Sequence, residues 1–291
     1  MRIRLAQLLV NEGLRKREFR VPVHLALGHE AIAASVSAAM AETDWLCLTH
    51  RNIHYNIARA TSLKAELAEL RLAPDGVAAG RLGSMNMVNP TRGIIYSSSI
   101  LGNDLCVGAG VALAESVAAT NAVVFIVTGD GAMEEGGFYE SVEFMKSAGL
   151  ATVVLIENNG WSMFTRISER RCAIRTEALA ETFGLSYELL TGNDPWRYTA
   201  ALSELRNVAV AQRSPVLVEV EISTLGDVTL PAEGRHVNYH HGMAPVTLSD
   251  WPLIRQDSGD PVHVLVERLG EPTVREIASR VHAALLDDIN S

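Results

Sequence analysis

A regular alternation of apolar strand-like runs with helix-like segments between residues 108 and 222 places the strongest constraint on the fold. The apolar runs are nearly continuous, which is typical of strands buried on both faces of a sheet. Runs of this kind that alternate with helices predict parallel strands covered by helices. We therefore predict an α/β fold with a doubly wound parallel sheet and helices on both faces. The expected strands are 122–127, 152–157, 185–190 and 215–222, and the expected helices are 108–119, 136–149 and 195–212.

The regions on either side of this alternation are helical or irregular. Helical patterns cover residues 1–19, 31–42 and 61–72, and one or two amphipathic helices are expected near the C-terminus. Residues 74–103 are rich in Gly, Ser and Asn without a sustained period, which usually marks a functional loop. Residues 225–252 are again irregular. We predict a single domain over residues 1–291 with a C-terminal helical extension.

Charge and cysteine content exclude several classes of protein. The formal net charge is −9 and the chain has no basic block, so we expect neither nucleic acid nor a membrane as a partner. Cys47, Cys106 and Cys172 are widely spaced, which argues against disulfides or a zinc site and predicts buried free thiols. Residues 1–19 carry charges on both sides of a short apolar run, unlike a signal peptide. We expect a soluble, cytoplasmic protein.

Polar side chains follow two of the expected strands at their carboxyl ends. Asp130 lies between Gly129 and Gly131, directly after one apolar run, and Asn158 and Asn159 end the next. In a doubly wound sheet, ligands bind beyond the carboxyl ends of the strands. A carboxylate and an amide oxygen suit Mg²⁺, and the N-terminus of the following helix suits a diphosphate. Either motif alone is usually a turn; together, after two strands, they predict a metal–diphosphate site.

The spacing of these motifs resembles the thiamine diphosphate–metal motif of the 2-oxo acid dehydrogenase E1 component, alpha subunit. The segment "GDGAMEEGGFYESVEFMKSAGLATVVLIENNGWSM" looks like that family, and so do "RVPVHLALGHEAIAASVSAAMAETDWLCLTHR", "GRLGSMNM" and "SILGNDLCVGAGVALA" upstream. The resemblance covers about residues 3–220. It implies a thiamine diphosphate-binding fold, specifically the module that binds the diphosphate and Mg²⁺.

The resemblance also implies the residues of the cofactor site. Mg²⁺ would be bound by the side chains of Asp130 and Asn159 and by the backbone carbonyl of Trp161. Gly131 and Ala132 would donate backbone N–H groups to the diphosphate, and Arg51 would contact it by charge-assisted hydrogen bonds. The remaining residues implied around the cofactor are His50, Leu101, Gly102, Gly129 and Met163.

The sequence departs from the family in three places. Ile53 stands where the family has a histidine and His54 follows it, while Glu143 replaces a common asparagine. The family's Tyr-Arg-x-His-Gly-His segment is missing, and residues 234–242 look more like the end of a transketolase N-terminal domain. His240 or His241 is therefore a candidate acid–base catalyst, together with His50. A surface loop with a chance His-His-Gly is the alternative.

The resemblance implies an enzyme that decarboxylates a 2-oxo acid and transfers the acyl or aldehyde unit to a lipoyl or acyl carrier protein. The glutamate that activates the cofactor lies on a second homologous domain in this superfamily, so we expect a separate β-type subunit in an α₂β₂ heterotetramer. A split transketolase-like enzyme is the alternative, and Arg92, Arg235 and Arg255 are its candidate phosphate ligands. A third hypothesis is a paralogue that binds partners without catalysis.

Overall fold

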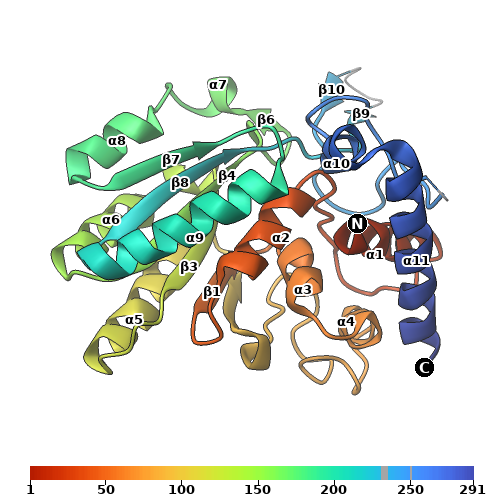
Figure 1. Ribbon diagram of the computed structural model, residues 1–291, viewed down its shortest axis with the longest axis horizontal. Coiled ribbons are helices and arrows are strands. Elements are labelled where there is room, and N and C mark those ends of the chain that lie inside the picture. Colours follow the sequence, from red (N-terminus) through yellow and green to blue (C-terminus); the bar gives the residue numbers. More distant parts are fainter. Residues whose placement is uncertain (231–234, 250) are drawn as a thin grey trace.

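The computed structural model describes residues 1–230, 235–249 and 251–291, and a parallel sheet forms its centre (Figure 1). The six strands pair in the order β2-β1-β3-β4-β8-β7, and every pair is parallel. This confirms the predicted α/β class. The strands are β1 (Trp45–Thr49), β2 (Ile94–Ser98), β3 (Val124–Gly129), β4 (Thr152–Asn158), β7 (Ser186–Leu190) and β8 (Pro215–Glu221).

The two central strands are apolar because both of their faces are buried. Along β4, Val153 and Leu155 belong to the core on one face, whereas Val154 and Ile156 belong to the core on the other. Alternate side chains of a strand point to opposite faces, so a continuous apolar run is what two covered faces require. Gly129 of β3 pairs with Glu157 of β4, so the polar residues after both strands emerge at the same edge.

Helices cover both faces of the sheet. The core on one face includes residues from α1 (Arg2–Arg15), α2 (Glu30–Ala39), α3 (Ile53–Arg59), α4 (Leu63–Leu70) and α9 (Pro195–Gln212). The core on the other face includes residues from α5 (Asn103–Val117), α6 (Gly136–Ser147) and α8 (Thr176–Phe183). The shorter elements are η1 (Pro90–Arg92), η2 (Ala132–Glu134), β5 (Trp161–Ser162), β6 (Thr165–Arg166), α7 (Ile167–Arg170), β9 (Val228–Leu230) and β10 (Arg235–Val237).

The C-terminal region returns to the start of the chain. Two helices, α10 (Pro261–Leu269) and α11 (Glu271–Asn290), end the protein, and α11 lies beside α1 in Figure 1. A buried ion cluster joins the two regions: Arg4 Nε lies 2.6 Å from a Glu30 carboxylate oxygen and Nη2 lies 2.8 Å from Asp260. Arg4 and Asp260 have no exposed side-chain surface. Removing one partner would strand a buried charge, so this cluster fixes α1 against α2 and the segment before α10.

Two strands and two cysteines differ from expectation. The sequence pattern did not predict β1 or β2, and β2 lies inside the stretch expected to be irregular. Both are short, and β2 carries Tyr96 and serines at the edge of the sheet, so neither has a long apolar run. Cys47 is buried on β1, but Cys106 and Cys172 are exposed, which contradicts their predicted burial. Cys106 lies on α5 with its thiol 3.5 Å from the Ser141 hydroxyl of α6, and Cys172 follows α7. The described helices include no candidate for a membrane span.

Candidate functional site

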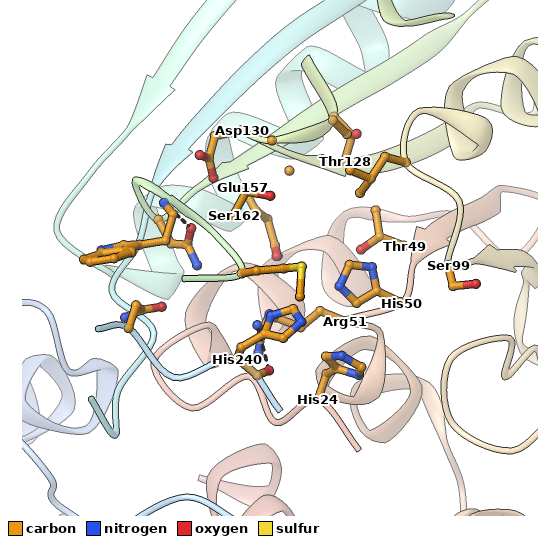
Figure 2. Close-up of a pocket in the computed structure, with 18 of the residues that line it drawn as sticks. His24, Thr49, His50, Arg51, Ser99, Thr128, Asp130, Glu157, Ser162 and His240 are labelled. Atoms are coloured by element: carbon orange, nitrogen blue, oxygen red, sulfur yellow. Dashed lines mark hydrogen bonds between the residues drawn. The ribbon is translucent and has the colours of Figure 1, made fainter. Parts of the chain in front are cut away.

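A cavity of about 400 Å³ opens at the carboxyl ends of β1, β3 and β4 (Figure 2). Figure 2 shows Asp130 toward one end of the cavity, His24 and His240 toward the other, and Glu157 between them. Most of the residues expected at a cofactor site lie in its wall. These are His50, Arg51, Leu101, Gly129, Asp130, Gly131, Ala132, Asn159, Trp161, Met163 and His240. The structure therefore gathers segments that are far apart in the sequence around one concave space.

Two expected residues lie outside this wall. Gly102 is buried at the N-terminus of α5, where its φ of 75° is in the left-handed region that favours glycine. His241 is exposed, with its ring centre 5.0 Å from that of His240. Of the two adjacent histidines considered as acid–base catalysts, only His240 lines the cavity. Both rings nevertheless lie near His24, with ring centres 5.0 Å away for His240 and 5.5 Å away for His241.

The carboxylate of Asp130 is buried and paired with an arginine that the sequence pattern did not single out. Arg170 Nη2 donates to Asp130 Oδ2 at 2.7 Å, and a second nitrogen of Arg170 contacts Glu134. Burial raises the pKa of Asp130 to about 6, and the pairing with Arg170 limits the rise. Arg170 ends α7, within the basic sequence Arg166–Arg171 that follows the Asn pair. This cluster of arginines was the sequence feature from which Arg170 could have been predicted as a site residue.

Asn158 and Asn159 have different partners. Asn158 Nδ2 donates to Glu219 at 2.7 Å on the neighbouring strand β8, away from the cavity lining. Asn159 lines the cavity; its Nδ2 donates to Thr224 Oγ1 at 2.9 Å, and its Oδ1 accepts the backbone N–H of Trp161 at 3.0 Å. Asn159 is therefore the member of the pair that presents an amide oxygen beside Asp130.

The donor set at this end of the cavity fits a hard divalent cation with a diphosphate. A carboxylate, an amide oxygen and a backbone carbonyl are the oxygen ligands that Mg²⁺ accepts. A Cβ placed on Gly131 would lie 2.7 Å from Ser162 Oγ, so any larger residue at this position would force Ser162 to move. Gly131 is followed by the short helix η2, whose first N–H groups lie beside the lining residues. Helix starts of this kind favour anions.

The guanidinium group of Arg51 is hydrogen-bonded to two backbone carbonyl groups. Its Nη1 contacts the carbonyl of Leu25, and its Nη2 donates to the carbonyl of His240 at 3.1 Å. Burial lowers the pKa of Arg51, and Tyr239 and Glu157 nearby oppose that effect. Arg51 borders the cavity as expected, but these contacts show that it also fixes the loop carrying His240 against the segment carrying His24.

Three histidine rings, those of His24, His50 and His240, gather at the other end of the cavity. The ring of His24 lies 4.8 Å from that of His50 and 5.0 Å from that of His240. Burial, together with the neighbouring cationic groups, lowers the pKa of His24 to about 2, of His50 to about 4 and of His240 to about 3. These rings are neutral at pH 7 and can accept or donate a hydrogen bond. His24 was missed in the sequence, where a lone histidine in an apolar segment gives no signal.

A buried carboxylate, Glu157, lies between the two ends of the cavity. It accepts hydrogen bonds from His29 Nδ1 at 3.1 Å, His54 Nε2 at 3.0 Å and the Tyr55 hydroxyl at 2.8 Å. Burial alone would raise the pKa of Glu157, but the His54 and His29 rings lower it below its usual range. His54, which follows the position of the family's histidine, is thus buried against Glu157 and does not line the cavity. A charged residue ending an apolar strand was the only sequence signal.

Known proteins similar to this chain fall into one family by sequence. Residues 6–223 match the family described as "Dehydrogenase E1 component". The chain is 28% identical over 198 residues to "Pyruvate dehydrogenase E1 component subunit alpha" of Rickettsia bellii, covering 68% of this chain and 61% of that protein. It is also 28% identical over 236 residues to the mitochondrial protein of the same name from Saccharomyces cerevisiae, covering 80% of this chain and 54% of that protein.

The chain thus spans somewhat over half the length of these curated relatives. Among solved structures, a transketolase from Pichia stipitis superposes with a TM-score of 0.64 at 15% identity, covering 100% of this chain and 47% of that chain. This likeness concerns the fold alone. Because the family match covers most of the chain, including both polar motifs at the strand ends, the chain belongs to the dehydrogenase E1 component family.

Proposed function

We propose that this chain is the α-type subunit of a thiamine diphosphate-dependent enzyme that decarboxylates a 2-oxo acid and transfers the resulting acyl or aldehyde unit. The observation that carries the proposal is the convergence of Asp130 and Asn159 at one end of a cavity, in a chain of the E1 family. Membership of that family implies thiamine diphosphate as the cofactor. The relatives' names, which describe a pyruvate dehydrogenase subunit, support the reaction class.

The residues at the first end of the cavity would hold the cofactor's diphosphate. Asp130 and Asn159 would bind Mg²⁺ with the carbonyl of Trp161, and Gly131 and Ala132 would donate N–H groups to the phosphate oxygens. Arg170 donates to Oδ2 of Asp130, so the metal would be bound through Oδ1. When bound, thiamine diphosphate supplies the nucleophilic carbon that the decarboxylation requires.

The histidines at the other end would act on the substrate. A neutral imidazole can hold a substrate oxygen and move a proton to or from it. His240 and His50 line the cavity, whereas His241 is exposed, so we assign the acid–base role to the first two. Arg51 would hold His240 in place through its backbone carbonyl.

A separate β-type subunit would complete the site, in an α₂β₂ heterotetramer. Among the described residues of the cavity wall, Glu157 is the carboxylate besides Asp130, and its side chain accepts hydrogen bonds from His29, His54 and Tyr55 of this chain. Glu157 is therefore unsuited to activate the cofactor. Leu101 and Met163 line the cavity yet are 40% and 56% exposed, which is consistent with a partner covering its mouth. A lipoyl or acyl carrier protein would accept the product, and we propose a cytoplasmic location.

A transketolase-like transfer of a two-carbon ketol unit is the second candidate, and the cluster of neutral histidines favours it. Uncharged imidazoles are better suited to hydrogen-bond the hydroxyl groups of a sugar substrate than the carboxylate of a 2-oxo acid substrate. Against it, Arg92 and Arg255 do not line the cavity: Arg92 contacts Arg59 and Arg255 pairs with Asp257 at the surface. The side chain of Arg235 lies outside the described part of the chain.

The test is a comparison of the chain alone with the chain co-purified with the product of its neighbouring reading frame. A 2-oxo acid and a ketose phosphate are supplied separately with thiamine diphosphate and Mg²⁺, and the cofactor adduct is trapped for mass spectrometry. We expect an adduct from the 2-oxo acid, in the two-chain sample only. Full activity of the isolated chain would contradict the subunit assignment. An adduct from the ketose phosphate alone would favour the second candidate. Absence of thiamine diphosphate binding in calorimetry would favour a non-catalytic paralogue.

A further inference from the structure

A continuous chain of hydrogen bonds connects the buried carboxylate of Glu157 with the cavity-lining amide of Asn159. Glu157 Oε2 lies 3.1 Å from His29 Nδ1, and His29 Nε2 lies 2.8 Å from Thr224 Oγ1. The same hydroxyl oxygen lies 2.9 Å from Asn159 Nδ2. His29 and Thr224 are 1% and 2% exposed, so water does not compete for these contacts.

The chemistry of the groups fixes the direction of every bond in this chain. The Glu157 carboxylate faces three groups that can donate to it, His29 Nδ1, His54 Nε2 and the Tyr55 hydroxyl, so it accepts from His29 and the proton of that ring lies on Nδ1. Burial lowers the pKa of His29, and the neutral ring then has Nε2 as an acceptor. The hydroxyl proton of Thr224 therefore points at His29, and its oxygen lone pairs face Asn159. Asn159 must present its NH₂ group to Thr224, which turns Oδ1 the opposite way.

A second contact demands the same orientation of the amide. The backbone N–H of Trp161 donates to Asn159 Oδ1 at 3.0 Å. If the amide were flipped, its NH₂ group would face the Trp161 N–H, and its oxygen would face the Thr224 lone pairs. Both contacts would become repulsive, so the side chain has one orientation. In that orientation Oδ1 keeps a second lone pair for a cation beside Asp130.

Close backbone packing brings Thr224 to His29. A Cβ on Gly28 would lie only 1.9 Å from the carbonyl oxygen of Ser223, so the loop after β8 can approach α2 only because residue 28 is glycine. The loop is held there by Leu225 N–H, which donates to the Leu27 carbonyl at 2.8 Å. The approach is built into the fold and does not depend on a ligand.

From this geometry we infer that Thr224 and His29 are positioning residues that set the amide orientation of Asn159 for metal binding. Thr224 does not line the cavity, and His29 lines it but has both ring nitrogens paired, with Glu157 and with Thr224. Thr224 acts on the Asn159 side chain directly, and His29 acts through Thr224 with Glu157 fixing its tautomer. The inference rests on the proposed function, because it assigns the Mg²⁺ site to Asp130 and Asn159. Groups that orient metal ligands typically change metal affinity 10- to 100-fold when they are removed.

The first experiment reads the tautomer of His29 directly. Two-dimensional long-range ¹H–¹⁵N NMR of the full chain, with the His29 signals assigned from His29→Gln, should show a neutral ring protonated on Nδ1. A ring protonated on Nε2, or a charged ring at pH 7, would overturn the inference. This measurement needs neither cofactor nor partner, so its result stands even if the proposed function fails.

The second experiment measures Mg²⁺ affinity by calorimetry, at saturating thiamine diphosphate, with the β-type subunit present. Thr224→Val replaces the hydroxyl with a methyl group and should weaken Mg²⁺ binding about 10-fold, while Thr224→Ser should restore it. The matched control is Thr152→Val, since Thr152 is buried at the opposite end of β4 and its hydroxyl has no hydrogen-bond partner within the described chain. Thr152→Val should leave the affinity unchanged.

The outcomes separate the two proposals. If the wild-type protein does not bind Mg²⁺ and thiamine diphosphate, the proposed function fails, whatever the NMR result. If the wild-type protein binds both and Thr224→Val binds Mg²⁺ as tightly as the wild type, the inference of a positioning role is wrong. A loss in Thr224→Val that Thr224→Ser does not restore would also overturn it, because packing and not the hydroxyl would then be responsible.

Discussion

Asp104 offers a sharp test of the electrostatics beneath the cavity. It lies in the first turn of α5 and is 1% exposed, and neither carboxylate oxygen has a hydrogen-bond partner within the described chain. Burial raises the pKa of Asp104 from 3.8 to about 7, against smaller opposing effects of its own N–H group and the Thr128 hydroxyl. Ionising this carboxyl at higher pH is therefore less favourable in the folded state than in the unfolded state, and it destabilises the folded protein.

The sign and size of the effect follow from linkage. Because the folded pKa is raised, the folded state binds the extra proton between pH 3.8 and about 7, and stability falls as pH rises through that window. The whole interval corresponds to about 4 kcal/mol, of which about 3 kcal/mol falls between pH 5 and pH 8. Asp104→Asn cannot ionise. From pH 5 to pH 8, the free energy of unfolding of Asp104→Asn should therefore rise by about 3 kcal/mol relative to that of the wild type.

The assay is urea unfolding of both proteins at pH 5, 6, 7 and 8, followed by circular dichroism. The quantity to compare is the change with pH in the difference between the two proteins, since a buried amide without a partner has its own constant cost of about 1–3 kcal/mol. Glu143→Gln, at an exposed position of α6, is the matched control and should follow the wild type at every pH. A difference between Asp104→Asn and wild type that stays constant from pH 5 to pH 8 would refute the reasoning.

Three further substitutions test other parts of the structure. Asp130→Ala should abolish Mg²⁺-dependent binding of thiamine diphosphate, measured by calorimetry with the partner present; unchanged Mg²⁺ affinity would rule out Asp130 as a ligand. Gly28→Ala should destabilise the protein in urea unfolding by more than about 1 kcal/mol, because its Cβ would lie 1.9 Å from the Ser223 carbonyl oxygen. Arg4→Ala strands two buried carboxylates and should cost about 3–5 kcal/mol of unfolding free energy; a loss below 1 kcal/mol would show that water reaches the cluster.

The sequence predicted the parts of the fold that depend on local pattern. The expected strands correspond to β3, β4, β7 and β8. β3, β4 and β8 are mostly apolar because both of their faces are buried, whereas β7 is a partly exposed strand at the edge of the sheet. The helix expected over 195–212 has those bounds in the structure, because Asp194 caps it and Pro195 starts it. The two short strands β1 and β2 escaped prediction. Their place at one side of the sheet comes from pairing with partners distant in sequence, which no local pattern records.

The residues of the candidate site also fall into those that the sequence could predict and those that only the folded structure identifies. Asp130 and the pair Asn158–Asn159 could be named from the sequence because they follow two apolar strands directly, and the resemblance to the family then singled out Asn159. Arg170 and His24 could not, because their significance depends on which atoms they meet after folding. Glu157 contacts His29, which is 128 residues away in the sequence, and that pairing exists only in the folded chain.

The sequence by itself therefore determined the fold class, the family and the pair of polar residues at the strand ends. These depend on periodicity and on short motifs, which are properties of contiguous residues. Only the tertiary structure decided that Asp130 pairs with Arg170, that the histidines form a neutral group, and that one orientation of the Asn159 amide satisfies its neighbours. Burial and hydrogen-bond direction set these properties, and both arise from contacts between segments that the sequence separates.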